Sequence, residues 1–169
     1  GGKGAALGDL TSAEVYDPAT ELFHTTTPMN EERALHSATL LNSGQVLVVG
    51  GVQTGGDVTA TTELFDPSTE TFSLTGTLSL GRKRHRAALL LDGSVLVEGG
   101  NFLENGEGGG ERETETAELY SPTTGLWTMV GDMSSQRSEH ESTLLEDGTV
   151  LVCGGILIDA PAEIYHPDT

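Results

Sequence analysis

The sequence predicts an all-β chain built from one repeated antiparallel unit, and three observations lead there. A glycine pair recurs in steps of 49, 49 and 55 residues, at Gly1-Gly2, Gly50-Gly51, Gly99-Gly100 and Gly154-Gly155. A second motif alternates with it, as "AEVYDP", "TELFDP", "AELYSP" and "AEIYHP". The chain is also rich in glycine and threonine, with apolar residues in short runs, which is typical of strands joined by turns.

The spacing inside the repeat is constant. Counting from the proline of the second motif, an aromatic residue follows by five, an arginine by fifteen, a histidine by eighteen and a glycine pair by thirty-two. These residues are Phe23, Phe72 and Trp127; Arg33, Arg82 and Arg137; His36, His85 and His140. Only the gap from the glycine pair to the next Glu varies, at 13, 13, 19 and 9 residues. One loop is therefore free to vary, and packing fixes the rest.

Each repeat predicts four strands, shown here for the second copy. Residues 36–41 form the first strand, and Ser43-Gly44 is a tight hairpin turn in which glycine supplies a positive φ. Residues 45–51 form the second strand, whose continuous apolar run predicts burial on both faces. Residues 62–67 form the third strand, which Pro67 ends, and residues 71–74 form the fourth, at the outer edge.

Four antiparallel strands in roughly 50 residues make one blade of a β-propeller. The glycine pairs, the aromatic before Asp-Pro and the downstream aromatic together resemble the kelch repeat of the bacterial type, which carries "AELYDP" and "DGxVLVxGG". The resemblance covers essentially the whole chain and implies a propeller of four-stranded antiparallel kelch blades. About three and a half blades are present: the end of one in 1–32, a second in 33–81, a third in 82–136 and the start of a fourth in 137–169.

The number of blades predicts a missing part. Kelch propellers usually have six or seven blades, which would need about 300 to 350 residues at roughly 50 each. An open arc would expose apolar blade faces and unpaired strand edges. We therefore expect the remainder of the propeller as a partner, and the alternative is a half-ring that a second chain completes.

Charge and composition exclude several function classes. The formal net charge is −18, with 26 acidic and 8 basic residues, which argues against nucleic acid and against docking on anionic lipid. No apolar stretch approaches the roughly 20 residues that cross a bilayer, so we expect no membrane insertion. The single cysteine, Cys153, lies inside a predicted second strand and is expected to be a small buried residue.

The repeated basic residues define the first candidate binding site. Successive strands of an antiparallel sheet run in opposite directions, so the start of the first strand, the end of the second and the start of the third lie at the same rim. The arginine, the histidine, the glycine pair and the third-strand glutamate of each repeat should therefore meet there. The rim candidates are Arg33, His36, Arg82, His85, Arg137 and His140. They would either face a ligand or be architectural, and we favour architecture because every blade carries them. The arginines should then pair with Glu14, Glu63 or Glu118, or with backbone carbonyls. Phe23, Phe72 and Trp127 should be largely buried at the outer parts of the blade interfaces.

The long variable loop, Asn101 to Thr116, is the second candidate site. It carries Glu104, Glu107 and Glu111 among glycines. Oxygen-rich loops suit Ca²⁺, but the D-x-[DN]-x-[DN]-G spacing is absent and a solvated loop is the commoner meaning, so we expect no cofactor. If the propeller binds a ligand, we expect specificity in this loop, and its glycines predict that it orders on binding.

A catalytic interpretation is weaker. Copper-radical oxidases similar to galactose oxidase carry a kelch-type propeller and use Tyr and His ligands, but Tyr165-His166 falls in register with the "YDP" turns. No nucleotide-binding loop, G-x-S-x-G, H-E-x-x-H or CxxC motif is present, and no catalytic residue or metal ligand is assigned.

The sequence thus favours a non-catalytic binding or scaffold propeller that recognises protein or glycan, outside the cell or on its envelope. Two alternatives stay open. One is the propeller domain of a secreted carbohydrate-active or copper-radical oxidase with catalytic residues outside this segment. The other is an assembly subunit that joins neighbouring chains. Fold alone does not choose between them.

Overall fold

The structure is a computed structural model that describes residues 2–4, 8–104, 109–156 and 160–167. In these residues all regular structure is β, the strands pair antiparallel, and there is no helix. None of the described residues therefore forms a helix able to cross a membrane. The all-β prediction is confirmed.

Two complete four-stranded sheets lie in the middle of the chain. The first has the order β5 (Ser37–Leu40), β6 (Val46–Val49), β7 (Thr62–Asp66) and β8 (Thr71–Leu74). The second has the order β9 (Arg86–Leu89), β10 (Val95–Glu98), β13 (Ala117–Ser121) and β14 (Leu126–Met129). In both, chain order and spatial order agree with the predicted repeat, and the fourth strand forms an edge.

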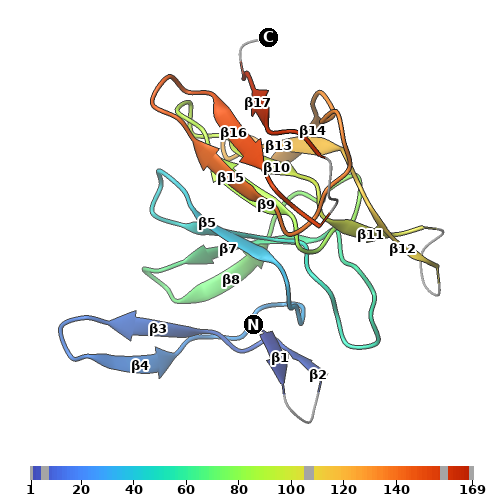
Figure 1. Ribbon diagram of the computed structural model, residues 1–169. Helices are drawn as coiled ribbons and strands as arrows, with labels where there is room; N and C mark the ends of the chain where they lie inside the picture. The colour runs from blue at the N-terminus through green and yellow to red at the C-terminus, as the bar shows by residue number, and fades with distance from the viewer. Residues whose placement is uncertain (1, 5–7, 105–108, 157–159, 168–169) are drawn as a thin grey trace.

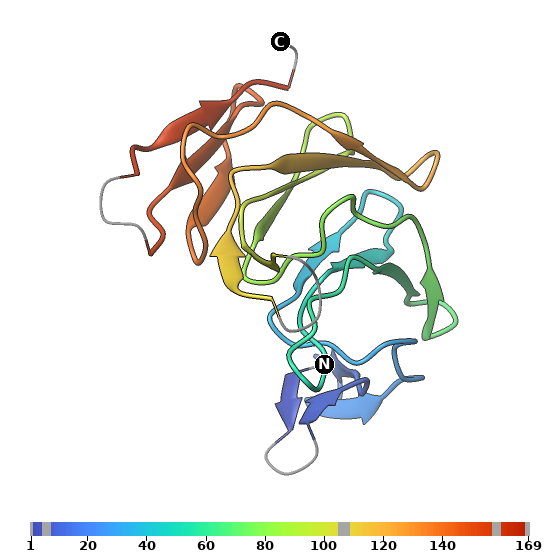
Figure 2. The ribbon, with the colours of Figure 1, turned by 90° about the vertical axis from the view of Figure 1, so that its right-hand side faces the viewer.

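Smaller sheets flank these two. The first repeat contributes β3 (Glu14–Asp17) and β4 (Leu22–Thr25), and the last contributes β15 (Glu141–Leu144), β16 (Val150–Cys153) and β17 (Glu163–Tyr165). Two-stranded hairpins leave from glycine pairs: β1 (Gly2–Gly4) with β2 (Gly8–Leu10), and β11 (Asn101–Leu103) with β12 (Glu111–Glu113). Figures 1 and 2 show the main sheets following one another in chain order.

The core lies between consecutive sheets. One buried cluster joins β5–β8 to the β9–β14 sheet, and it includes Val49, Leu78, Val97 and Tyr120. A second cluster joins the β9–β14 sheet to the last sheet, and it includes Leu96 and Val152. All of β10, and all of β6 after its first residue, is buried, which confirms for these two the prediction that second strands are covered on both faces. In β16 only alternate residues are buried.

The hairpin turns form as predicted. Gly44, Gly93 and Gly148 have φ values of 87°, 88° and 86°, which glycine adopts without steric cost. In the third repeat, the carboxylate of Asp92 accepts hydrogen bonds from the backbone N–H of Ser94 at 2.9 Å and from its hydroxyl at 2.6 Å. These contacts fix the register of β9 against β10.

The burial predicted for the fourth-strand aromatics is wrong for Phe23 and holds only in part for the other two. Phe23 is 67% exposed, while Phe72 and Trp127 are half-buried. Each ring packs on the aromatic residue of its own third strand, at centroid distances of 5.1, 4.8 and 5.0 Å. The fourth strand is an edge strand, so one side of the ring stays open. The β3–β4 sheet also has no inner strands among the described residues, which leaves Phe23 the most exposed.

Cys153 is half-buried, not buried as predicted. It and Leu151 lie on the face of β16 that no further sheet covers among the described residues. The equivalent residues of β10 are buried because the preceding and following sheets both pack against it.

Candidate functional site

The repeated arginine and the third-strand glutamate form a buried clamp at one end of each sheet. In the second repeat, Nη2 of Arg33 lies 2.7 Å from Oε1 of Glu63, and Nη1 donates to the carbonyl of Gly50 at 2.7 Å. The other two ion pairs are Arg82–Glu118 at 3.0 Å and Arg137–Glu163 at 2.5 Å. Each guanidinium therefore ties the end of the second strand to the start of the third.

The predicted arginine–glutamate pairing is confirmed for Glu63 and Glu118. The third arginine takes Glu163, while Glu14 is exposed and takes part in none of these pairs. Each arginine pairs with the third strand that follows it in the chain, whereas Glu14 precedes Arg33. All three arginine side chains are 0% exposed, so they hold the frame and do not face solvent.

The clamp carboxylates also hold the segment that enters each repeat. Oε2 of Glu63 accepts the backbone N–H and the side-chain amide of Asn30, both at 2.8 Å. Burial would raise the pKa of Glu63, but the bonds from Asn30 and Arg33 outweigh it and lower this pKa. The carboxylate is therefore charged when it pairs with Arg33.

The glycine pairs join each repeat to the arginine of the next. The backbone N–H of Gly51 donates to the carbonyl of Arg82 at 2.9 Å, and that of Gly100 donates to the carbonyl of Arg137 at 2.8 Å. A Cβ on Gly50 would overlap the carbonyl oxygen of Arg82, and Gly50 has a φ of 60°. Glycine is therefore required here both for its close approach to the next repeat and for its unusual φ.

The repeated histidines lie beside these junctions. His85 is 3% exposed, and its Nε2 lies 2.8 Å from the hydroxyl of Ser37 in the preceding repeat. Burial lowers the pKa of His85 to about 3, with Arg82 adding repulsion. Burial likewise lowers the pKa of the half-buried His36 to about 4. Both imidazoles are therefore neutral at pH 7.

Between the repeated arginine and the repeated histidine, one residue in each repeat lines a common cavity. Leu35, Arg84 and Glu139 have φ values of 57°, 56° and 54°, in the left-handed region that side chains rarely adopt. The N–H of Arg84 donates to the carbonyl of Leu35 at 2.9 Å, and that of Glu139 to the carbonyl of Arg84 at 3.1 Å. These bonds run from repeat to repeat and offset the strain.

These residues line a cavity of about 390 Å³, together with His36, His85 and Arg86. Nε of Arg84 lies 3.1 Å from Oε1 of Glu139, and Nη2 of Arg86 lies 2.6 Å from Oε1 of Glu141. The four side chains of these pairs are partly exposed, so water screens both pairs. We call this cavity and its six lining residues the rim pocket.

The sequence interpretation missed Leu35, Arg84, Arg86 and Glu139. Two signals pointed to them. Residues between the constant arginine and histidine differ in every repeat, and the run "RKRHR" at 82–86 holds four of the eight basic residues of the chain. Of the two variable positions in each repeat, only the one next to the histidine lines the rim pocket, while the one next to the arginine is buried.

The arms of the long loop, β11 and β12, pair as a hairpin without a ligand, which corrects the expectation of ordering on binding for these arms. Residues 105–108 lie outside the described residues. Lys83 anchors it, because its backbone N–H donates to the carbonyl of Asn101 at 3.0 Å and its ammonium lies 2.8 Å from Glu111. Glu104 lies 2.5 Å from Arg112. Glu107 lies outside the described residues.

Two of the three candidate carboxylates thus have basic partners. In the described part of the chain, no group of three His, Cys, Asp or Glu side chains is arranged to hold a metal ion. Calcium at 101–116 remains an untested alternative.

No protein-family model matches this chain, and no curated protein matches it. The interpretation of function therefore depends on the repeat and on the geometry of the rim.

Proposed function

We propose that the chain is a series of kelch-type β-propeller blades and acts as a non-catalytic binding module. Two features support the propeller. Four-stranded antiparallel sheets pack face to face through apolar clusters, and each repeats the same junction to the next.

One observation carries the binding proposal. Leu35, Arg84 and Glu139 share one backbone conformation and one hydrogen-bonded chain, yet they present an apolar, a basic and an acidic side chain to the rim pocket. A rigid frame that holds different side chains at equivalent positions is suited to recognition. The buried arginines and His85 are the frame.

The β11–β12 hairpin extends this surface. Glu113 of this hairpin accepts a hydrogen bond from the hydroxyl of Ser138, next to Glu139, at 2.9 Å. Glu111 of the same hairpin pairs with Lys83, next to Arg84. The hairpin and the rim pocket therefore border the same end of the sheets. We expect an extended partner, a protein or a glycan outside the cell or on its envelope, to contact both.

The test is binding to a panel of purified oligosaccharides and peptides with acidic, basic and neutral members, measured by biolayer interferometry. Selective binding that Arg84→Glu weakens by about tenfold or more supports the proposal. Glu146→Gln, an exposed change on a distant hairpin, is the matched control and should bind like the unsubstituted chain. Binding that Arg84→Glu leaves unchanged, or no selective binding to any member, contradicts it.

A second proposal, assembly with another copy of the chain, rests on the free edge of β3. In the described residues β3 pairs only with β4, whereas the equivalent β7 and β13 pair on both sides. The free edge of β3 has the geometry to accept another strand. Sedimentation velocity tests this: a concentration-dependent dimer would favour a second chain, and a monomer would contradict self-assembly.

A further inference from the structure

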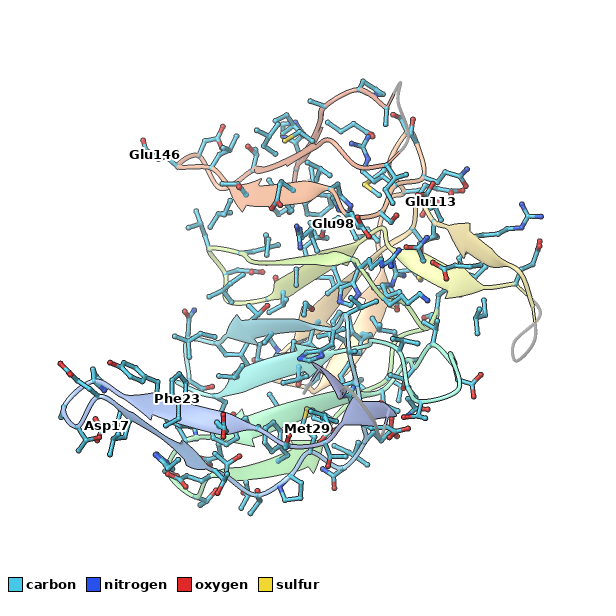
Figure 3. The ribbon with its side chains drawn as sticks, turned by 60° about the horizontal axis from the view of Figure 1, so that its bottom comes forward. Asp17, Phe23, Met29, Glu98, Glu113 and Glu146 are labelled. Carbon is cyan, nitrogen blue, oxygen red and sulfur yellow. The ribbon has the colours of Figure 1, made fainter. Side chains whose placement is uncertain are left out.

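The two complete sheets differ at one inward position. Val49 ends β6 and is 0% exposed, within the apolar cluster of its interface. Glu98 ends β10 at the same place in the repeat and is 1% exposed. Figure 3 shows Glu98 where the β9–β14 sheet meets the last sheet. A buried carboxylate thus replaces a buried methyl-bearing side chain.

Glu98 has no hydrogen-bond partner in the described part of the chain. Both carboxylate oxygens are buried and accept no hydrogen bond. Nε2 of His140 lies 3.7 Å from Oε1, within ion-pair range but beyond hydrogen-bonding distance, and neither ring nitrogen of His140 has a hydrogen-bond partner. Leaving charged groups in this state is costly, because they have lost their hydration without replacement.

The neighbouring basic groups bond to other acceptors. Arg86 stands opposite Glu98 in the β9–β10 ladder, but its Nε donates to the carbonyl of His140 at 2.5 Å and its Nη2 to Glu141. Arg82 directs its terminal nitrogens to Gly99, Thr116 and Glu118. Two acceptors therefore stay open together in the described part of the chain, Oε1 and Oε2 of Glu98.

A small cavity adjoins these acceptors. It measures about 70 Å³, more than the roughly 30 Å³ share of one water molecule. Its walls are mostly apolar, from Leu96, Met133, Val152 and Tyr165. Two lining carboxylates differ in their bonding: Glu163 pairs with Arg137, while Glu98 accepts no hydrogen bond. Asp132 and Ile164 also line it and are exposed, so they mark its mouth at the surface.

We propose that this cavity binds a primary alkylammonium group. Such a group carries one positive charge and three N–H donors on an apolar stem, which match the two open oxygens of the buried Glu98 carboxylate and the apolar walls. A metal ion fits less well, because one free carboxylate among apolar walls leaves most of its coordination to water.

The alkylammonium could come from a free amine or from a lysine side chain, and two probes separate these sources. n-Butylammonium chloride represents the free amine, and Nα-acetyl-lysine N-methylamide represents lysine. n-Butanol lacks the charge, and tetramethylammonium has the charge but no N–H donor. Isothermal titration calorimetry of the chain with each compound, at constant ionic strength, measures binding.

We expect saturable binding of n-butylammonium and none of n-butanol or tetramethylammonium. Glu98→Gln should weaken binding by about tenfold or more, because it removes the charge while keeping the shape. Glu98→Val, which installs the residue found at Val49, should abolish it. Glu146→Gln keeps the cavity and should bind normally.

Binding of the lysine derivative would extend the ligand class to a protein partner, and its failure beside a bound n-butylammonium would limit the class to free amines. The proposal is wrong if n-butylammonium does not bind, if tetramethylammonium binds equally well, or if Glu98→Val keeps the affinity. This inference is independent of the rim pocket, so each can fail without the other.

Discussion

Two successive interfaces between sheets use the same frame and differ in what they bury. In both, a glycine N–H donates to the carbonyl of the next arginine, at 2.9 Å for Gly51 and 2.8 Å for Gly100. The first interface contains Val49 and a Ser37–His85 hydrogen bond of 2.8 Å. The second contains Glu98, whose two carboxylate oxygens accept no hydrogen bond and lie near His140, at 3.7 Å for Oε1. The backbone frame fixes where the interface lies, and one inward residue sets its chemistry.

The largest expected effect comes from breaking the frame. Arg82→Ala leaves Glu118 buried without its cation, and we expect a loss of about 3–5 kcal/mol in the free energy of unfolding, measured in urea. Arg137→Ala should cost less, because its partner Glu163 is 21% exposed and can be hydrated. Equal losses for the two variants would show that burial does not govern the clamp.

The next effect compares a covered junction with an open one. Gly50→Ala adds a Cβ into the carbonyl of Arg82 at a φ of 60°, so we expect a loss above about 2 kcal/mol. Gly154→Ala has a similar φ of 74°, but no described atom lies within 4 Å of the added carbon, so only strain of about 1 kcal/mol remains. If both cost the same, contact with the next repeat contributes nothing.

The pH dependence of stability is a smaller effect that belongs to the first interface. The pKa of His85 falls from an ordinary value of 6.5 to about 3 on folding, so the unfolded chain takes up a proton first as the pH drops. The contribution of His85 to the free energy of unfolding is complete above pH 6.5 and is lost as the pH falls toward 3. His36, with a pKa of about 4, acts in the same direction.

Between pH 6.5 and 5, His85 alone should remove about 2 kcal/mol, at up to about 1.4 kcal/mol per pH unit. Chemical denaturation of the unsubstituted chain and His85→Gln at both pH values isolates this contribution, since the carboxylates are common to both. The variant should show the flatter dependence. Parallel dependences would mean that His85 is not held neutral by burial.

The features that recur in every repeat could be predicted from the sequence. Strand order, the turns at Gly44 and Gly93, and the pairing of Arg33 and Arg82 with third-strand glutamates all follow from constant spacing. The spacing is constant because the same packing contacts recur in each sheet. The closed propeller and the kelch family remain proposals.

Properties that depend on neighbouring sheets were not predictable. Phe23 has the same place in the repeat as Trp127, but it is exposed because its sheet has only two described strands. The open carboxylate oxygens of Glu98 could not be predicted from the sequence either, because they depend on which acceptors Arg86 donates to. The rim pocket was not predictable either, because it depends on a left-handed backbone at Leu35, Arg84 and Glu139. None of these residue types favours that conformation.

The most direct test of the central claim, that the constant residues build the frame while departures from it bind, is the stability of Glu98→Val without any amine. Because this variant removes a buried carboxylate that accepts no hydrogen bond and restores the residue of the first interface, the account predicts a gain of about 1–2 kcal/mol in the free energy of unfolding. A loss of stability would show that Glu98 is a structural part of the frame, and would contradict the account.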